Sequence, residues 1–270
     1  MVIGTSRSGL LQSDLGNVRV CRASCPEDFV RVLTSVEPGV VVNLLRDETE
    51  EGLDVHRAVI RWCSSSSALY CYASSALALD GYSGCPLTED LPAKSVSTYG
   101  RFKQSCETAM REEVRCRSLI LRFASIHGWV PHSVTRSEAF LRKLARNEHV
   151  VVDRGVIQNR LFDRDLAVVI VELLEGQITG VVHLGARDSS EEYAFLRGVA
   201  VAFDRDPGLV LSGPSRNVDL VVVPSRVMFL LGAWHVPPES RVLDGLLSCA
   251  ALWPYMGPRA ALTRRPDTAG

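Results

Sequence analysis

The stretch VVVNLLRDETEEGLDVHRAVIRWCSSSSALYCYA, residues 40–73, decides the fold class. It opens with a continuous apolar run over residues 40–45, which is typical of a buried parallel strand. Apolar residues at helical spacing predict a helix over residues 53–63, and an apolar strand follows over residues 68–73. Strand, helix and strand in this order form the βαβ unit from which parallel sheets are built.

The alternation continues on both sides of this stretch. Upstream, we predict strands over residues 2–4 and 17–23 and a helix over 26–36 with Ser24 as its cap. Downstream in the first half, we predict a helix over 99–115 and a strand over 118–123. The second half is less regular, with helices over 137–146, 164–175 and 191–203 and strands over 149–153 and 180–185. From Gly208 onward the chain is rich in Pro, Ser and Gly, and we expect a small lobe that closes over the sheet.

We therefore expect an α/β protein with a doubly wound, Rossmann-like parallel sheet and a smaller C-terminal substrate lobe. Residues 1–127 would form the Rossmann-like domain, with 156–186 returning to it. Residues 128–155 and 187–270 would form the lobe. Such sheets bind ligands at the carboxyl ends of their strands, where Asn43, Ser75 and the loop after Phe123 are expected.

Composition excludes several classes of protein. The chain has 270 residues, and its 30 basic and 31 acidic residues are well mixed, which argues against a nucleic-acid partner. It lacks an apolar run of about 18 residues, so we predict no membrane span, and its start lacks a signal peptide's apolar segment. The eight cysteines form no metal-like group, so we expect no metal and reduced thiols in a cytoplasmic protein. Residues 264–270 are expected to be a frayed tail.

A phenol, an ammonium and a hydroxyl are spaced as carbonyl reduction by hydride transfer requires. Tyr99 and Lys103 stand four residues apart on a predicted helix, so their side chains share one face. The ammonium can lower the pKa of the phenol, and an upstream hydroxyl, Ser74 or Ser75, can hold the substrate oxygen. This spacing also occurs by chance in many helices, where it means an aromatic residue and a solvated lysine.

Several ordered blocks surround this pair. They are Ala73-Ser74-Ser75, Pro86-Leu87-Thr88-Glu89-Asp90, Tyr99-Gly100-Arg101-Phe102-Lys103, LILRFASIHG at residues 119–128, and Asn159-Arg160-Leu161-Phe162. With these blocks the sequence resembles the extended short-chain dehydrogenase/reductases. It is most similar to the branch of dTDP-4-dehydrorhamnose reductases and related nucleotide-sugar 4-ketoreductases. The resemblance runs over residues 17–232 and is strongest over 70–107.

The resemblance implies a role for each block. Tyr99 would donate a proton to a sugar carbonyl as hydride arrives from NADPH or NADH, and Ser75 would polarise that carbonyl. Lys103 would lower the pKa of Tyr99 and hydrogen-bond the nicotinamide ribose. Arg160 would hold the diphosphate of a nucleotide-sugar substrate, since its fork of donors suits phosphate. The implied setting is deoxysugar biosynthesis, and a homodimer is an open option.

The remaining substrate contacts would come from Ser74, His127 and Trp129. His127 replaces a tyrosine of the family, and it lies with Trp129 in the loop where substrate would lie. For both residues, packing inside the protein is an equal alternative to contact with substrate.

The predicted cofactor-binding residues include departures from the family pattern. They are Gly4, Ser6, Arg7, Gly9, Arg22, Asn43 and Lys103. Arg7 and Leu10 stand where the family's turn has glycines that let the backbone approach a pyrophosphate. Only about a dozen residues separate the first two predicted strands, whereas a full βαβ unit takes roughly 30. Arg22 replaces the acidic residue that holds an adenosine ribose, which favours a 2′-phosphate and therefore NADPH.

Two functional hypotheses from different classes follow. The first is a nicotinamide-dependent reductase of a 4-keto nucleotide sugar, which the intact Ser75, Tyr99 and Lys103 set favours. The second is a catalytically retired reductase that binds a nucleotide or regulates a protein partner, as the regulatory subunit of methionine adenosyltransferase does within this family. The shortened Gly-rich unit favours the second. An epimerase or dehydratase is a third, less supported option, because the sequence shows no clear extra acid/base pair.

Overall fold

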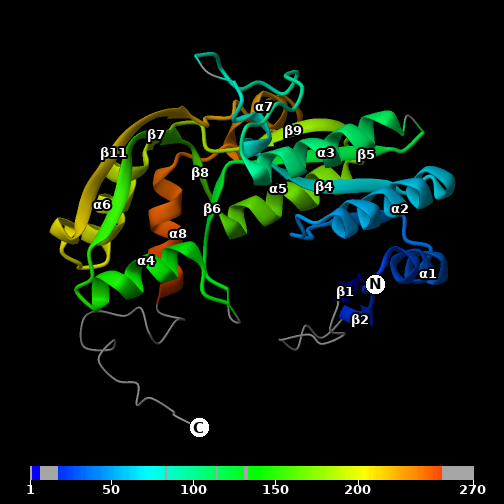
Figure 1. Cartoon of the computed structure of the whole chain (residues 1–270), viewed down its shortest axis with the longest axis horizontal. Helices are drawn as coiled ribbons and strands as arrows, with labels where there is room; N and C mark the ends of the chain where they lie inside the picture. The colour runs from blue at the N-terminus through cyan, green and yellow to red at the C-terminus, as the bar shows by residue number, and fades with distance from the viewer. Residues whose placement is uncertain (1, 7–17, 83, 114, 131–132, 251–270) are drawn as a thin grey trace, which may run out of the picture. The chain divides into compact units, whose positions relative to one another are not determined.

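The structure, a computed structural model, describes residues 2–6, 18–82, 84–113, 115–130 and 133–250 (Figure 1). The chain falls into two compact units. The N-terminal unit contains Met1–Tyr82, Glu89–Phe123 and Val171–Val182, and the C-terminal unit contains Ser83–Thr88, Ala124–Ile170 and His183–Gly270. These two units are defined by contacts within the chain. The predicted boundary at residue 127 between a Rossmann-like domain and a substrate lobe stays a prediction.

The central sheet has the strand order β3-β4-β5-β9. Its strands are β3 (Val40–Asn43), β4 (Leu69–Ser75), β5 (Ser118–Phe123) and β9 (Gly180–Leu184). β4 runs parallel to β3 on one side and to β5 on the other. β4 is apolar and almost fully buried, because helices cover the sheet. The predicted fold class, a Rossmann-like parallel sheet with flanking helices, is confirmed.

Three helices belong to the N-terminal unit: α1 (Pro26–Val36), α2 (Glu50–Ser66) and α3 (Thr98–Glu112). Figure 1 shows α2 and α3 running alongside β4 and β5. Their apolar faces build one core with the sheet, which includes Phe29, Leu33, Val59, Ile60, Tyr70, Tyr72, Met110 and Ile120. Helix α1 has the predicted bounds, but its cap is Cys25 rather than Ser24. Ser24 instead donates its amide and hydroxyl to the Asp28 carboxylate, at 3.1 and 3.0 Å.

The predicted burial of the 40–45 run is wrong. β3 is an edge strand of the central sheet, and the side chains of Val40 and Val42 are 37% and 40% exposed. The first two strands, β1 (Val2–Ser6) and β2 (Val18–Arg22), pair in parallel with each other in a separate two-stranded sheet. A strand with one hydrogen-bonded neighbour keeps one flank accessible, which explains this exposure.

The C-terminal unit contains a three-stranded sheet, ordered β10-β7-β11, and a pair of short parallel strands. The strands are β7 (Val150–Gln158), β10 (Ser190–Glu191), β11 (Val210–Asp219), β6 (Ser125–His127) and β8 (Arg160–Phe162). β11 pairs in parallel with β7, so the region after residue 208 begins with a strand that extends a sheet. The expected closure of this region over the sheet stays a prediction. The predicted tail at 264–270 lies outside the described residues.

The helices of this unit are α4 (Arg136–Ala145), α6 (Glu192–Ala202), α7 (Ser225–Leu230) and α8 (Ser240–Ala250). Helix α5 (Asp163–Glu175) begins in this unit and ends in the other. The core includes Trp129, Phe140, Leu141, Phe162, Phe195, Val199, Phe203 and Leu246. Gly245 lets α8 approach β8, because a Cβ there would lie 2.5 Å from the ring of Phe162.

Candidate active site

The carboxyl end of β4 supplies the predicted serine. Ser75 is the last residue of β4 and caps the short 3₁₀ helix η1 (Ala76–Leu79), where its Oγ accepts a hydrogen bond from the Leu77 amide at 3.2 Å. Ser75 is only partly buried. Its hydroxyl therefore lies at the edge of a parallel sheet where this fold places ligands.

The first turn of α3 presents the predicted phenol. Ser97 caps α3 by accepting from the Gly100 amide at 3.1 Å, and Tyr99 is the second residue of the helix. A Cβ on Gly100 would lie 2.1 Å from the carbonyl oxygen of Leu77. Only glycine therefore lets this turn pack against η1, and this contact brings Tyr99 beside Ser75.

Lys103 lies one turn further along α3 and is buried, with 3% of its surface exposed. Its Nζ donates a hydrogen bond to the Ala73 carbonyl at 2.7 Å. The same ammonium lies 4.7 Å from the ring centre of Tyr72 and 5.5 Å from that of Tyr99. Burial lowers the pKa of Lys103, because it disfavours the charged amine.

Burial and neighbouring groups set the pKa of Tyr99. Burial raises this pKa above its ordinary value, and this rise outweighs the opposing effects of the Arg46 charge and the Ser75 hydroxyl. The expected effect of Lys103 on the pKa of Tyr99 stays a prediction. A raised pKa keeps the phenol protonated near neutral pH, as a proton donor requires.

Ser74 is not available to a substrate in this structure. It is 2% exposed, and its Oγ donates to Glu107 Oε1 at 2.6 Å. Glu107 also accepts from Arg122 Nε and Nη2, at 3.0 and 2.7 Å, and both of these charged side chains are fully buried. Ser74 belongs here to a buried network that ties α3 to β4 and β5, and its substrate role stays a prediction.

Four of the predicted cofactor residues lie on the first three strands. Gly4 and Ser6 are in β1, and Arg22 ends β2 with an exposed side chain. Asn43 ends β3, donates to the Tyr70 hydroxyl at 2.7 Å and accepts from the Leu45 amide at 2.9 Å. Two further predicted residues, Arg7 and Gly9, lie outside the described residues.

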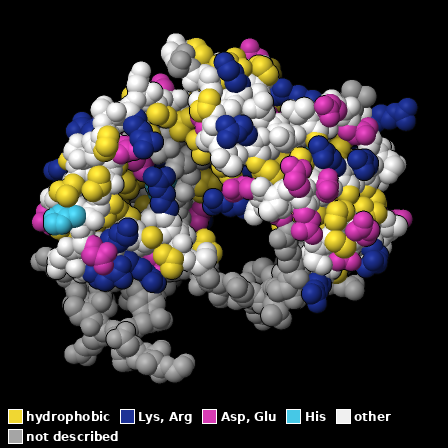
Figure 2. All heavy atoms as spheres, viewed as in Figure 1, with side chains coloured by type: hydrophobic (Ala, Val, Ile, Leu, Met, Phe, Trp, Pro, Cys, Tyr) yellow, Lys and Arg dark blue, Asp and Glu magenta, His cyan; other side chains and the backbone are white. Residues whose placement is uncertain are grey.

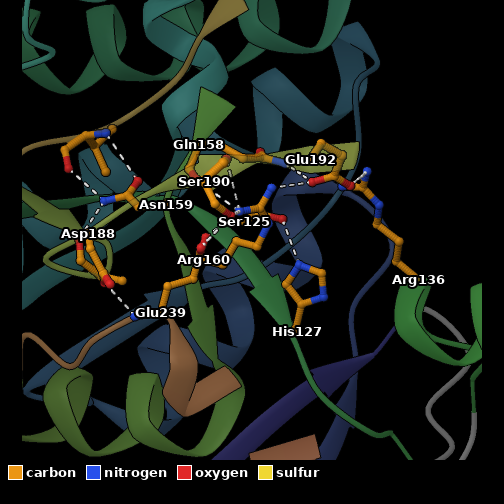
Figure 3. Close-up of polar contacts among 12 residues, drawn as sticks. Ser125, His127, Arg136, Gln158, Asn159, Arg160, Asp188, Ser190, Glu192 and Glu239 are labelled. Atoms are coloured by element: carbon orange, nitrogen blue, oxygen red, sulfur yellow. Dashed lines mark hydrogen bonds and ion pairs between the residues drawn. The ribbon is translucent and has the colours of Figure 1, made fainter. Parts of the chain in front are cut away.

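Arg160 does not present a free fork to a diphosphate. It is fully buried in the C-terminal unit, where Nη2 pairs with Glu192 at 2.6 Å and Nη1 pairs with Glu239 (Figure 3). Nη1 also donates to the Ser190 hydroxyl at 3.0 Å, and Arg136 pairs with the other oxygen of Glu192 at 2.5 Å. Two carboxylates occupy this guanidinium in the structure, and the phosphate role of Arg160 stays a prediction. No local sequence pattern indicates these partners of Arg160.

His127 and Trp129 pack inside the same unit. His127 is 3% exposed, and its Nδ1 lies 3.0 Å from the Ser137 hydroxyl. Burial lowers the pKa of His127 to about 3, so the ring is neutral. Trp129 belongs to the core and donates its Nε1 to the Leu246 carbonyl at 3.0 Å. Of the two readings for these residues, the structure favours packing over contact with substrate.

The described residues contain neither a metal-binding group of side chains nor a membrane-spanning helix. Among the described residues, no group of three or more His, Cys, Asp or Glu side chains is placed to hold a metal ion. No helix in the same part of the chain is long and apolar enough to cross a membrane. On the described part of the face drawn in Figure 2, basic side chains lie next to acidic ones.

The parallel sheet with its flanking helices places the chain in the class of Rossmann-like proteins. With Ser75 at the end of β4 and Tyr99 and Lys103 on α3 beside it, the chain resembles short-chain dehydrogenase/reductases. The comparison with protein families is more specific. Residues 52–218, more than half of the chain, match the family described as RmlD substrate binding domain, and the chain belongs to that family. The resemblance drawn from the sequence is thus confirmed.

Among curated proteins, the chain is 27% identical over 160 residues to a dTDP-4-keto-6-deoxy-D-glucose reductase of Streptomyces niveus. The match covers 58% of this chain and 54% of that protein, so the chain spans about half the length of the curated relative it matches. Among solved structures, a dTDP-4-dehydrorhamnose reductase of Bacillus anthracis, in complex with NADP, superposes with a TM-score of 0.75 at 16% identity. That superposition covers 92% of this chain and 98% of the other.

A dTDP-glucose 4,6-dehydratase of Bacillus anthracis, in complex with NAD, superposes with a TM-score of 0.77 at 12% identity. That superposition covers 94% of this chain and 89% of the dehydratase chain. A reductase and a dehydratase thus match about equally well, and at these identities the likeness shows the fold alone.

Proposed function

We propose that the protein reduces the keto group of a nucleotide-activated deoxysugar, with a reduced nicotinamide dinucleotide as the hydride source. One observation carries this proposal. The structure brings Ser75, Tyr99 and Lys103 together at the carboxyl end of β4, although they come from two elements. The match to a curated dTDP-sugar reductase supports the substrate class.

The nicotinamide end of a dinucleotide fits these residues. Lys103 is a buried amine whose hydrogen bond goes to a backbone carbonyl, and no carboxylate of the described residues forms an ion pair with it. Lys103 and the Asn43 side chain would hold the nicotinamide ribose end, and the bound cofactor would supply hydride. Tyr99 would donate its hydroxyl proton to the sugar oxygen while Ser75 holds that oxygen.

We further infer a preference for NADPH over NADH. Arg22 ends β2 with an exposed side chain, at the position where the fold contacts the adenosine ribose. A guanidinium there suits a 2′-phosphate, whereas an acidic residue suits a free 2′-hydroxyl. The Arg22→Asp variant should lose affinity for NADPH much more than for NADH, as measured by the fluorescence of the reduced cofactor. Tighter binding of NADH to the parent protein would contradict this assignment.

A second candidate function is a reductase-like protein that binds a nucleotide or a protein partner without turnover. The family match begins at residue 52, so it does not include the predicted Gly-rich turn at residues 4–10. That turn carries Arg7 and Leu10 where relatives have glycines. Bulk at those positions opposes the approach of a pyrophosphate to the backbone.

One experiment separates the two functions. The full chain is incubated with a dTDP-4-keto-6-deoxyhexose and either NADPH or NADH, and the loss of reduced cofactor is followed. Reduction of the sugar with stoichiometric loss of cofactor supports the enzyme. If neither dinucleotide raises the melting temperature at millimolar concentration, the reductase proposal fails and the binding function replaces it.

A further inference from the structure

Arg46 lies beside the candidate proton donor, although no motif in the sequence assigns it a role. Its guanidinium carbon is 5.5 Å from the ring centre of Tyr99, the same distance as the Lys103 ammonium. A cation within about 6 Å of an aromatic centre is attracted by the ring. The two cations differ in setting, since Lys103 is buried while the Arg46 side chain is 79% exposed.

The loop that carries Arg46 is anchored at both of its ends. At the start, Asn43 Oδ1 accepts from the Leu45 amide at 2.9 Å. At the end, the Thr49 hydroxyl donates to Asp47 at 2.6 Å and accepts from the Gly52 amide at 3.1 Å, which caps α2. A Cβ on Gly52 would lie 2.4 Å from the Asp47 carbonyl oxygen. The backbone of the loop that carries Arg46 is therefore fixed by hydrogen bonds at both of its ends.

Glu48 holds the Arg46 side chain in this loop. Its Oε1 lies 3.1 Å from Arg46 Nε, which leaves the rest of the guanidinium fork for other contacts. The other groups around Tyr99 are the Ser75 hydroxyl at the end of β4, the buried Tyr72 phenol on β4 and Lys103 on α3. Glu48 is the carboxylate that acts on Tyr99, and its charge opposes that of Arg46.

We propose that Arg46 is a positioning residue for Tyr99: its guanidinium orients the phenol ring and stabilises the negative charge left when Tyr99 gives up its proton. The proposal rests on the proposed function, because this charge develops only if Tyr99 is the proton donor. Lys103 is less suited to the task, since its ammonium is directed to the Ala73 carbonyl. Arg46 also lowers the pKa of Tyr99 against the rise that burial causes.

The chemical step balances around this pair. A bound reduced dinucleotide would supply hydride to the carbonyl carbon, and the carbonyl π electrons would move onto its oxygen. The O–H bond of Tyr99 breaks, its proton forms a new O–H bond on that oxygen, and the electron pair stays on the phenolate. Arg46 faces this phenolate until solvent returns a proton. Its guanidinium therefore stabilises the negative charge on Tyr99 and does not act on the sugar.

The first test measures the phenol itself. We suggest 3,5-difluorotyrosine at position 99, because it ionises nearer neutral pH than tyrosine, and fluorine NMR then reports this one residue. Arg46→Gln should move the titration midpoint up, and Glu48→Gln should move it down. The matched control is Arg61→Gln, an exposed arginine on α2 that does not act on Tyr99. Added salt should shrink both shifts, since Arg46 is exposed.

Unchanged midpoints in Arg46→Gln and Glu48→Gln at low salt would overturn the proposal. The second test compares turnover, in which Arg46→Gln should move the alkaline limb of the pH profile in parallel with the midpoint and Arg46→Lys should restore part of it. If the midpoint moves but the parent protein shows no turnover, the coupling of Arg46 to Tyr99 stands and the proposed function fails. The two failures are therefore distinguishable.

Discussion

Lys103 and Arg160 are both buried cations, yet their surroundings differ in kind. Arg160 pairs with Glu192 and Glu239, so its charge is neutralised inside the C-terminal unit. Lys103 donates to the Ala73 carbonyl and lies over two aromatic rings, and burial lowers its pKa. A neutralised buried charge serves structure, whereas a buried charge without a direct carboxylate partner costs stability and indicates function.

The largest effect on turnover should come from a substitution in the site that contains Lys103. Tyr99→Phe removes the proton donor and keeps the shape, so turnover should fall by about 10²–10⁴-fold with little change in melting temperature. Tyr82→Phe is the matched control, because its hydroxyl only donates to the Pro92 carbonyl. Turnover within a few fold of the parent in Tyr99→Phe would remove the contrast between the two regions.

The Arg160 network should show the opposite behaviour, a large loss of stability. Arg160→Met removes the cation paired with the buried Glu239 and one of the two cations paired with Glu192, which should lower the free energy of unfolding by about 3–5 kcal/mol in chemical denaturation. Changing Glu192 and Glu239 to glutamine in the same chain should restore much of this loss, since no uncompensated charge remains. An Arg160→Met protein that keeps the parental stability but fails to bind nucleoside diphosphates would instead support a direct contact between Arg160 and phosphate.

The packing of Gly100 tests how precisely the N-terminal site is held. In Gly100→Ala the new Cβ would clash with the Leu77 carbonyl, so α3 must shift away from η1. Overpacking of this kind costs about 1–3 kcal/mol in stability. Turnover should fall together with stability, because Tyr99 moves with the helix. Gly198→Ala is the control, since a Cβ there meets no atom within 4 Å.

A pH titration sharpens the comparison within the N-terminal unit. His56 is buried, its Nε2 lies 2.9 Å from the Cys106 carbonyl, and its Nδ1 lies 2.8 Å from the Tyr70 hydroxyl. Burial lowers its pKa to about 4 from 6.5. The unfolded chain therefore binds more protons between these values, so stability is full above pH 6.5 and is lost as pH falls toward 4.

The expected slope from His56 is about 1.4 kcal/mol per pH unit in that window. Denaturant unfolding at a series of pH values should show this slope in the parent protein and a flatter curve in His56→Gln. His149→Gln changes an exposed histidine and is the control. Equal slopes in the parent and in His56→Gln would show that the buried hydrogen bonds of His56 do not require the neutral ring.

Elements with a strong apolar pattern could be predicted from the sequence. The helix at residues 26–36 and the strand at 118–123 have their predicted bounds, because their apolar residues recur at the right period. The strand at 210–219 (VLSGPSRNVD) was not predicted, since it has neither alternation nor β-branched runs and its side chains are mostly exposed. Its pairing with β7 gives it a strand conformation that its composition does not favour.

The residues of the candidate site likewise fall into those that a local sequence pattern predicts and those that it does not. Tyr99 and Lys103 could be predicted because four residues on a helix fix which side chains share a face. The partners of Arg160 lie 32 and 79 residues away in the chain, and no local pattern predicts such pairings. Arg46 was missed for a related reason, since it reaches Tyr99 from the loop after a different strand.

The parallel pairing of β7 with β11 has a consequence for biosynthesis. Val150 pairs with Val210, so a strand must wait for a partner 60 residues further along the chain, from 150 to 210. During synthesis, β7 leaves the ribosome long before β11 exists, and its backbone donors and acceptors stay available on that side. Nascent chains that stop between the two strands should therefore be the most prone to aggregate and to recruit chaperones, and chains that extend past Asp219 should be protected.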